Sequence, residues 1–147
     1  MKILITGGTG MVGSAFRNIE TNHDIFLAGS KDANLLVKKE FLDLIDLQQP
    51  DAVIHLAAKV GGVKGNTDFV ADFYSENVTM NCNVLDACHE SGVERVVSLL
   101  STCVYPDDVT YPLTEDQIHH GPPHESNFGY AYAKRMLDVH SRAINKQ

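Results

Sequence analysis

Two residues near the end of the chain have the types and spacing that proton transfer needs. Tyr130 and Lys134 are four positions apart, which places both side chains on one face of a helix. A neighbouring cation favours tyrosinate, so we expect Lys134 to lower the pKa of Tyr130 from about 10 towards neutral pH. Such a tyrosine can give or take a proton at a carbonyl or alcohol oxygen, and the lysine can reach a cofactor ribose. The alternative is an amphipathic helix with a chance Tyr and Lys. Tyr132 is expected to face elsewhere and to pack.

A second group of polar side chains follows the last predicted strand. Ser101, Thr102 and Cys103 come directly after an apolar run. The carboxyl ends of parallel strands are where open α/β sheets bind ligands, so a hydroxyl here can bond the same carbonyl oxygen as Tyr130. Cys103 adds a thiol, although most unpaired cysteines are simply small buried apolar residues. The predicted catalytic residues are Tyr130, Lys134, Ser101 and Cys103.

Glycines fill the junction between the first strand and the first helix. Gly7 permits a tight turn, Gly10 lets the backbone approach a pyrophosphate, and Gly13 lets helix and strand pack closely. The helix start adds free N–H groups and the positive end of its dipole. A glycine-rich turn without a ligand is the alternative, but its place between strand and helix favours a dinucleotide site. The predicted contacts are Gly7, Gly8, Thr9, Gly10, Met11, Val12 and Gly13.

The residues after the second predicted strand indicate which dinucleotide binds. In NAD sites an acid just beyond this strand usually holds the adenosine 2′-OH. Here Ser30 and Lys31 take that place, and both suit a 2′-phosphate. Asp32 lies close enough to complicate this assignment, and the alternative for it is to cap the following turn. We expect NADP(H) rather than NAD(H), with Ser30, Lys31 and Asp32 near the adenosine ribose.

The elements that position these residues alternate between strand and helix. This order predicts a Rossmann-like, doubly wound α/β fold with a parallel sheet over residues 1–147. The strand order should be 3-2-1-4-5 or its truncated equivalent, with the third strand a short stub near Asn34 and Leu35. The predicted strands cover residues 2–5, 24–28, 52–56 and 95–100. The predicted helices begin near Met11 and cover residues 37–47, 68–91 and 127 onward.

Two further segments carry their own signals. Met11, Val12, Ala15, Phe16 and Ile19 follow helical spacing after the glycine turn. The glycines at 61, 62 and 65 indicate a loop, and so does the stretch of residues 101–125, which holds four of the five prolines. Loops of that length are more often functional than idle.

Composition excludes several classes of protein. The 147 residues are 44% apolar and 21% charged, as in an ordinary globular domain. A net charge of −7 argues against nucleic-acid and anionic-membrane binding, and no apolar run could span a bilayer. The start of the chain has no cleavable apolar region, so we expect a cytoplasmic protein. Three cysteines without a C-x-x-C argue against disulfides and zinc. We expect no metal: His119, His120 and His124 are interpreted as solvated loop residues.

Several motifs together resemble the extended short-chain dehydrogenase/reductase superfamily. They are Thr6-Gly-x-x-Gly-x-x-Gly13, His55-Leu-Ala-Ala58, Asn77-Val78, Ser101 and Tyr130-x-x-x-Lys134. More narrowly, four segments resemble the GDP-L-fucose synthases, which are epimerase–reductases of GDP-4-keto-6-deoxy-D-mannose. These segments are Ala58-Lys-Val-Gly-Gly62, Leu100-Ser-Thr-Cys-Val-Tyr-Pro106, Ile118-His-His-Gly-Pro-Pro-His124 and Ser126-Asn-Phe-Gly-Tyr-Ala-Tyr-Ala-Lys-Arg135.

The resemblance implies a role for each matching residue. It implies that Ser101 and Tyr130 bond the carbonyl oxygen and that Lys134 serves the ribose and the tyrosine. It implies epimerisation at carbons 3 and 5 with Cys103 as one of two acid–base groups; the other, a histidine, would lie beyond residue 147. It also implies NADPH as the reductant and cofactor contacts along residues 31–36 and at Leu99, Leu100, Ser101, Thr102 and Lys134.

The resemblance also sets expectations for partners and extent. The family's chain is about twice as long, so we expect a Rossmann domain truncated before the sugar-nucleotide half. We expect a GDP-sugar substrate and a homodimer formed through the long helix and the last helix. Phe73, Met80, Val84 and Cys88 lie along one face of the long helix; the alternative is that all four are core residues.

Two alternatives for function remain open. The first is a non-catalytic NADP-binding half-module, which would not need Tyr130, Lys134 and Cys103. The second is another sugar-nucleotide epimerase or dehydratase of the same fold. Dehydratases carry an acidic pair after the loop threonine, whereas Thr102 here is followed by Cys103 and Val104, which weakens the dehydratase alternative.

Overall fold

The computed structural model describes all 147 residues, except for the side chain of Val63. The residues divide into two compact units. The first unit contains Met1–Ala58 and Thr79–Leu99, and the second contains Lys59–Val78 and Leu100–Gln147. The predicted glycine turn therefore belongs to the first unit, while the predicted catalytic residues belong to the second.

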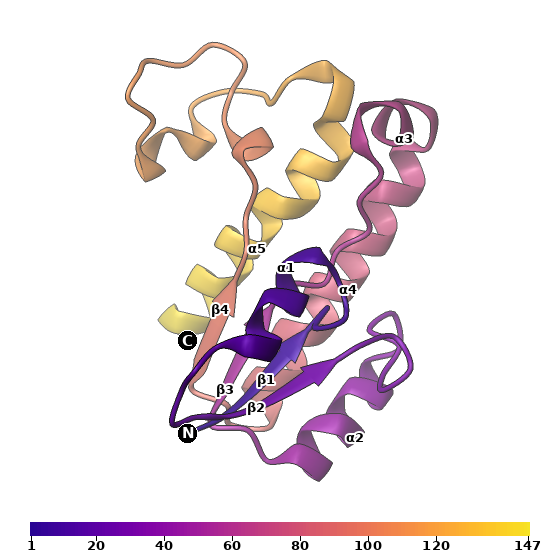
Figure 1. Cartoon of the computed structure of the whole chain (residues 1–147). Coiled ribbons are helices and arrows are strands. Elements are labelled where there is room, and N and C mark those ends of the chain that lie inside the picture. The colour runs from indigo at the N-terminus through magenta and orange to yellow at the C-terminus, as the bar shows by residue number, and fades with distance from the viewer. The chain divides into compact units, whose positions relative to one another are not determined.

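The first unit is built on a parallel sheet. Its strands are β1 (Lys2–Thr6), β2 (Asp24–Ala28), β3 (Ala52–His55) and β4 (Arg95–Ser98). They lie in the order β2-β1-β3-β4 (Figure 1). Leu4 on β1 is opposite Phe26 on one side and Val53 on the other. The Rossmann-like parallel sheet and the truncated strand order expected from the sequence are confirmed.

Helices α2 (Lys38–Gln48) and α4 (Val70–Glu90) supply the rest of this unit's core. Leu4 and Val53 from the sheet meet Phe41 from α2 and Val84 from the part of α4 that belongs to the unit, and all four are fully buried. The apolar spacing predicted both helices because one face of each must cover the sheet. α2 ends as Gln49 takes a left-handed φ of 47°, directly before Pro50.

Two expectations for this unit are wrong. The stub strand near Asn34 and Leu35 is a turn instead, since the Asn34 side chain accepts a hydrogen bond from Leu36 N–H and its carbonyl accepts one from Val37 N–H. The helix after the glycine turn is only α1 (Met11–Ser14), followed by a 3-10 turn, η1 (Ala15–Asn18). Gly13 is the buried residue of α1, so its apolar side chains project outward.

The second unit consists of helices and 3-10 turns. They are α3 (Gly62–Asp68), the first part of α4, η2 (Thr102–Val104), η3 (Glu115–His119), η4 (Glu125–Asn127) and α5 (Phe128–Lys146). The predicted last helix is confirmed, and the predicted proline-rich loop contains η2, η3 and η4. Pro106 and Pro123 form an isolated antiparallel bridge that closes the base of this loop.

The glycine-rich stretch around residues 61–66 is helical, not the loop that we expected. A Cβ on Gly61 would meet the Phe73 ring at 2.6 Å, and one on Gly65 would meet it at 3.2 Å. The absence of side chains lets the start of α3 lie against that ring, so glycine here serves close packing. α4 starts after α3 at Val70, two residues later than expected.

Candidate active site

The glycine turn has the conformation that its sequence predicts. Gly7 has a φ of +68°, and a Cβ there would meet Ala57 N at 2.8 Å. A Cβ on Gly13 would lie 2.4 Å from the Gly7 carbonyl oxygen. Gly8 is buried against β2, where a Cβ would meet Leu27 Cα at 2.7 Å. The chain's own packing therefore explains the glycines at these three positions.

Gly10 is different because the protein itself hardly constrains it. It is exposed, and a Cβ there would meet only the Gly7 oxygen, at 3.2 Å. Thr9, Met11 and Val12 are exposed beside it, and the first N–H groups of a helix have no acceptor within the helix. An exposed glycine beside free N–H donors fits the close approach of a phosphate.

Three polar residues follow β2. Asp32 is hydrogen-bonded within a turn, whereas Ser30 and Lys31 are exposed to solvent. The Asp32 carboxylate accepts a hydrogen bond of 2.7 Å from Gly29 N–H, and Asp32 N–H donates to the Gly29 oxygen at 3.0 Å. Asp32 therefore closes the turn of residues 29–32 that precedes it, and not the following turn that the alternative expected. Ser30 and Lys31 are exposed at the carboxyl end of β2.

A buried polar chain lies directly behind the glycine turn, and the sequence did not reveal its role. Thr6 Oγ1 is 2.7 Å from His55 Nδ1, and His55 Nε2 is 3.0 Å from Asn81 Oδ1. Ala57 N–H donates to the Thr6 hydroxyl at 3.4 Å. These bonds tie the ends of β1 and β3 to α4. A histidine at the end of a buried strand was the signal that could have indicated such a network.

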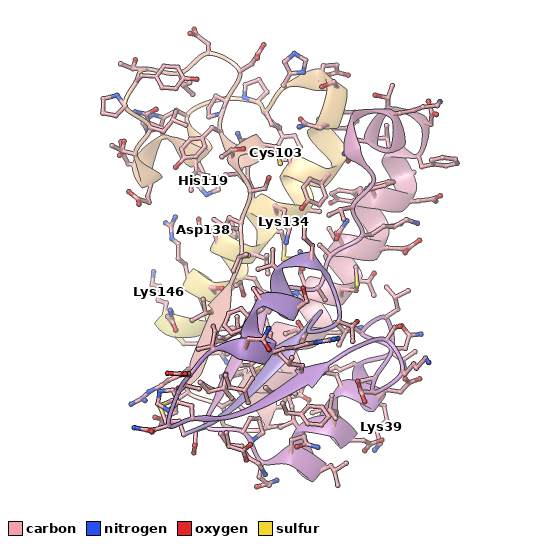
Figure 2. All side chains as sticks on the ribbon, viewed as in Figure 1. Lys39, Cys103, His119, Lys134, Asp138 and Lys146 are labelled. Carbon is pink, nitrogen blue, oxygen red and sulfur yellow. The ribbon has the colours of Figure 1, made fainter. Side chains whose placement is uncertain are left out.

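In the second unit, α5 presents Tyr130 and Lys134 on one face, as their spacing predicts. The Lys134 ammonium lies 6.0 Å from the centre of the Tyr130 ring. Lys134 is only 2% exposed, and Tyr130 is half-buried. Figure 2 shows Lys134 on α5 and Cys103 near the start of the proline-rich loop.

The expected tuning of Tyr130 is wrong in direction. Burial raises the pKa of Tyr130 above its usual value of 10, and the charge of Cys103 raises it further. Burial also lowers the pKa of Lys134, and Cys103 opposes this shift. Desolvation thus outweighs the attraction that the sequence argument considered, because Lys134 is buried and Tyr130 is half-buried. Tyr130 remains a protonated phenol at neutral pH.

Ser101 and Cys103 are hydrogen-bonded to each other at the start of η2. Ser101 is the N-cap of this turn, and its hydroxyl accepts a hydrogen bond of 3.5 Å from Cys103 N–H. Burial raises the pKa of the Cys103 thiol, while Ser101, Lys134 and Arg135 lower it. Cys103, Tyr130 and Lys134 therefore lie within electrostatic reach of one another. Thr102 is exposed, and so are Leu99 in the first unit and Leu100 in the second.

Arg135 is a residue of this site that sequence reasoning missed. Its guanidinium donates to the carbonyl oxygens of Val104 and Gly121, at 2.6 and 2.8 Å. The centre of the Tyr132 ring lies 5.3 Å from the guanidinium carbon and Tyr132 is 42% exposed, so this tyrosine packs on Arg135 at the surface. An arginine next to a predicted catalytic lysine carried no pattern that could reveal these carbonyl partners.

Asn77 holds the segment that leads into α3. Its fully buried amide accepts from Lys59 N–H at 2.9 Å and donates to the Lys59 oxygen at 3.0 Å. The Lys59 ammonium in turn pairs with Glu76 at 2.5 Å. The Asn77 side chain therefore satisfies both backbone groups of Lys59, as a neighbouring strand would.

Two histidines of the loop, His119 and His124, have side-chain partners. His119 Nε2 lies 2.8 Å from Asp138, and His124 Nδ1 lies 2.8 Å from the Ser126 hydroxyl. Among the described side chains, no three His, Cys, Asp or Glu residues gather as metal ligands. Nor does any helix of the described chain have the length and apolar character to cross a bilayer.

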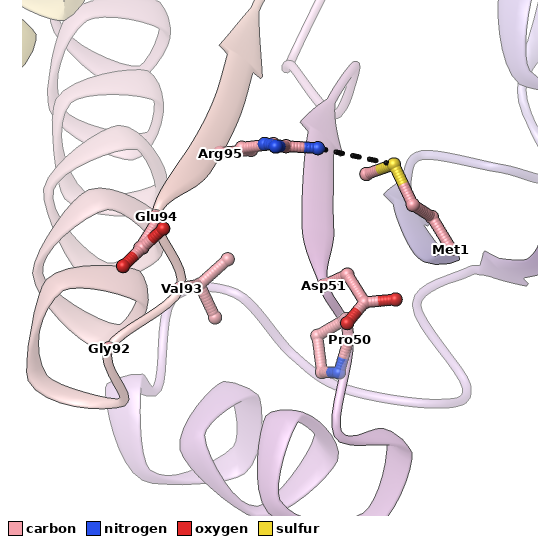
Figure 3. A pocket seen from close by; sticks show the side chains of 7 residues that line it. All are labelled: Met1, Pro50, Asp51, Gly92, Val93, Glu94 and Arg95. Atoms are coloured by element: carbon pink, nitrogen blue, oxygen red, sulfur yellow. Dashed lines mark hydrogen bonds between the residues drawn. The ribbon is translucent and has the colours of Figure 1, made fainter.

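A separate hollow of about 460 Å³ lies at the other end of the sheet (Figure 3). Asp51 accepts the Lys2 backbone N–H there at 2.6 Å, and Arg95 lies 3.3 Å from the Met1 sulfur. These residues stand at the amino ends of the strands, whereas open parallel sheets bind ligands at the carboxyl ends. We therefore do not assign this hollow to the candidate site.

Comparison with known proteins places this geometry in a family. Residues 3–147 match the NAD dependent epimerase/dehydratase family. The chain is 46% identical over 98% of its length to a "Probable GDP-L-fucose synthase" of Drosophila melanogaster, and 43% identical over 99% to a GDP-L-fucose synthase of Dictyostelium discoideum. A crystal structure of a GDP-L-fucose synthetase from Naegleria fowleri bound to NADP superposes on 99% of it, with a TM-score of 0.91 and 45% identity.

These matches also define how much of each relative is shared. The chain spans 46% of the Drosophila protein, 47% of the Dictyostelium protein and 48% of the Naegleria chain, about half the length of each. The shared half carries both the glycine turn and the Tyr130–Lys134 pair. The chain belongs to the NAD dependent epimerase/dehydratase family.

Proposed function

We propose that this chain carries the cofactor-binding and proton-transfer residues of a GDP-L-fucose synthase. The reaction would be 3,5-epimerisation of GDP-4-keto-6-deoxy-D-mannose followed by NADPH-dependent reduction of its 4-keto group. One observation carries the proposal: Cys103, Tyr130 and Lys134 lie within electrostatic reach of one another in one unit. Relatives with that printed name at 46% and 43% identity support it. The chain would act in the cytoplasm.

The cofactor would be NADP(H), bound by residues 1–147 as a Rossmann domain. Exposed Gly10 and the start of α1 suit a pyrophosphate, and Lys31 with Ser30 suits a 2′-phosphate. Asp32 already accepts a hydrogen bond from Gly29 N–H, so its carboxylate is held in the turn instead of facing a ribose 2′-OH. When bound, NADPH supplies the hydride. The relative from Naegleria fowleri was solved with NADP.

Reduction needs a proton at the carbonyl oxygen that receives the hydride's electrons. Tyr130 fits as its donor because burial keeps the phenol protonated. The Ser101 hydroxyl would donate a second hydrogen bond to the same oxygen. Lys134, cationic and buried, would stabilise the tyrosinate left behind and bond the cofactor ribose.

Epimerisation needs a proton removed from a carbon beside the carbonyl and another delivered to the opposite face. Burial raises the pKa of Cys103, so at neutral pH it holds its proton and fits the delivering role. The second acid–base group that the family resemblance implies would take up the proton removed from the sugar carbon, and the S–H bond of Cys103 would break as the new C–H bond forms. Lys134 and Arg135, which lower the pKa of Cys103, would stabilise the thiolate until it is reprotonated.

The test is a chimera in which this chain replaces the matching segment of the Drosophila relative. It is given the 4-keto sugar nucleotide and NADPH in deuterated water. Cys103→Ser should lose deuterium uptake at the sugar carbons while NADPH is still oxidised, and Tyr130→Phe should do the reverse. If neither variant differs from the parent chimera, the assigned roles are wrong. If the parent binds NADPH but is inactive, the non-catalytic NADP-binding module replaces this proposal.

We also propose that the chain forms a homodimer through α4 and α5. The face first considered cannot serve, because three of its four residues are buried within one chain and the fourth, Met80, is half-buried. The buried residues are Phe73, Val84 and Cys88, at 5%, 0% and 1% exposed. An apolar groove of about 490 Å³ supports the contact instead. Its walls include the exposed side chains of Tyr74 on α4 and Val139 on α5, and a second copy would cover them.

Sedimentation equilibrium tests the dimer. Val139→Glu places a charge in the groove and should shift the chain to monomer at tens of micromolar, on the order of a weak interface's dissociation constant. Tyr111→Glu is the matched control, because Tyr111 is 77% exposed in the same unit and does not line the groove. A wild-type chain that is monomeric at that concentration contradicts the proposal.

A further inference from the structure

Arg135 is buried, charged and bonded entirely to the backbone of the proline-rich loop. Only 6% of the residue is exposed. Nε donates to the Val104 oxygen at 2.6 Å, and Nη1 donates to the Gly121 oxygen at 2.8 Å. Nη2 is buried with no hydrogen-bond partner among the described residues, but the Tyr132 ring lies close to the guanidinium, at 5.3 Å. A buried cation is costly unless its donors are used, so a site that keeps one requires those bonds.

The two carbonyl groups belong to opposite ends of the loop. Val104 directly follows Cys103 and ends η2, whose turn is closed by a 3.1 Å bond from Val104 N–H to the Ser101 oxygen. Gly121 precedes Pro122, whose oxygen accepts a 3.2 Å bond from Asp107 N–H. A planar guanidinium offers N–H groups in a rigid fork, so one side chain can hold both ends at once.

The same helix carries the other reacting groups. Arg135 follows Lys134 in α5, and Tyr130 lies on the previous turn of that helix. The bond to Val104 therefore links the turn that contains Cys103 to the helix that contains Tyr130 and Lys134.

We propose that Arg135 is a positioning residue that holds the Cys103 turn in place against α5 and so sets the thiol's distance from Tyr130 and Lys134. Its importance for catalysis rests on the function proposed above, but its action on the turn does not. The arginine would not touch the substrate. Its effect would reach the reaction through the placement of Cys103.

Thiol reactivity can distinguish positioning from two simpler roles. Releasing the turn exposes Cys103 and removes the burial that raises its pKa, so alkylation should become faster. If Arg135 acted only through its charge, its loss would raise the thiol pKa and slow alkylation. If Arg135 only stabilised the fold, its loss would raise the alkylation rates of all three cysteines by similar factors.

The experiment measures iodoacetamide alkylation of each cysteine by peptide mass spectrometry across pH, on the 147-residue chain without cofactor or substrate. Arg135→Lys keeps the charge and cannot bond both carbonyl oxygens; Arg135→Met removes the charge as well. Cys82 and Cys88 in the same molecules report on the rest of the fold, since Cys88 is 1% exposed. Arg142→Lys is the matched control on α5, because the Arg142 side chain is 72% exposed and pairs only with Asp138 in the described structure.

In both Arg135 variants iodoacetamide should alkylate Cys103 about tenfold faster than in the wild type. A fall of one pKa unit has an effect of this size on the thiolate population. In the same variants the alkylation rates of Cys82 and Cys88 should stay within about twofold of the wild-type rates. In the Arg142→Lys chain the rate at Cys103 should also stay within about twofold of the wild-type rate. The proposal is overturned if Arg135→Lys leaves the Cys103 rate unchanged, if Arg135→Met slows it, or if all three cysteines accelerate in step. Since no cofactor or sugar is present, these outcomes are independent of whether the proposed reaction occurs.

Discussion

The Thr6 hydroxyl and the His55 imidazole lie 2.7 Å apart, and neither residue is more than 1% exposed. Thr6 is the last residue before the glycine turn, so this pair anchors the turn to β3. The other imidazole nitrogen is bonded to Asn81, and Ala57 N–H reaches the same threonine hydroxyl.

Thr6→Val should destabilise the chain by about 1–3 kcal/mol, because it removes the buried hydroxyl that lies 2.7 Å from His55 Nδ1. Urea unfolding measures the change. Thr110→Val is the matched control, since Thr110 is exposed in the loop, and its free energy of unfolding should change by less than about 0.5 kcal/mol. Equal effects of the two substitutions would show that the hydroxyl bond contributes nothing.

Gly10→Ala and Gly13→Ala should separate cofactor binding from folding. At Gly13 the new methyl would lie 2.4 Å from the Gly7 oxygen, so the turn must distort, with a loss of about 1–3 kcal/mol or more in stability. At Gly10 the nearest atom is 3.2 Å away, so the fold should persist while NADPH binding weakens about tenfold or more. Thermal unfolding and fluorescence titration measure the two quantities. A Gly10→Ala chain that binds NADPH normally contradicts the assigned approach of the pyrophosphate.

Lys31→Ala should weaken NADP(H) binding by about tenfold, the equivalent of one charge-assisted hydrogen bond, and leave NAD(H) binding unchanged. Titration of both cofactors gives the preference. Lys39→Ala is the control, because Lys39 is an exposed lysine on α2 (Figure 2). Its ammonium pairs with Asp43 on the same helix. An unaltered preference in Lys31→Ala would remove this residue from the site.

Cys88 should make the chain lose stability at high pH. Burial raises its pKa from 9.0 to about 12. Between those values the unfolded chain releases the thiol proton and the folded chain keeps it. The free energy of unfolding should therefore fall with rising pH, with a slope of up to about 1.4 kcal/mol per pH unit from this group. Below pH 9 the contribution is constant.

Urea unfolding of wild type and Cys88→Ala between pH 8 and pH 10.5 tests this, roughly spanning the start of that window. Cys82 and Cys103 also have raised pKa values, so they remain in both chains, and the difference in slope belongs to Cys88. Parallel stability curves would mean that Cys88 ionises in the folded protein as readily as in the unfolded one.

The fold was predictable where the spacing of residues within an element agrees with the face that the element must bury in the fold. The glycine turn, the parallel strands and the Tyr130–Lys134 face all follow from spacing, because periodicity directly reports which side of an element is buried. α3 was missed since its glycines look like a loop in sequence. The space that they leave is filled by the Phe73 ring, which lies in another helix.

The electrostatics of the site could not be predicted from the sequence. The raised pKa of Tyr130 depends first on how deeply the ring is buried, a quantity that a four-residue spacing does not contain. The partners of Arg135 are backbone oxygens of Val104 and Gly121, and backbone groups leave no trace in residue types. A long-range contact between two polar side chains, such as that of Thr6 with His55, is easier to predict, because both residue types can be read from the sequence.

The proline-rich loop is fixed at its base and open at its tip. Pro106 and Pro123 are paired and buried, whereas Asp108 and Tyr111 are exposed. A change of sequence or length at residues 108–111 therefore has no direct route to Cys103. This tip is the place in the second unit to insert an affinity tag or a labelling residue, so that the protein can be captured or followed by spectroscopy while the base of the loop stays intact.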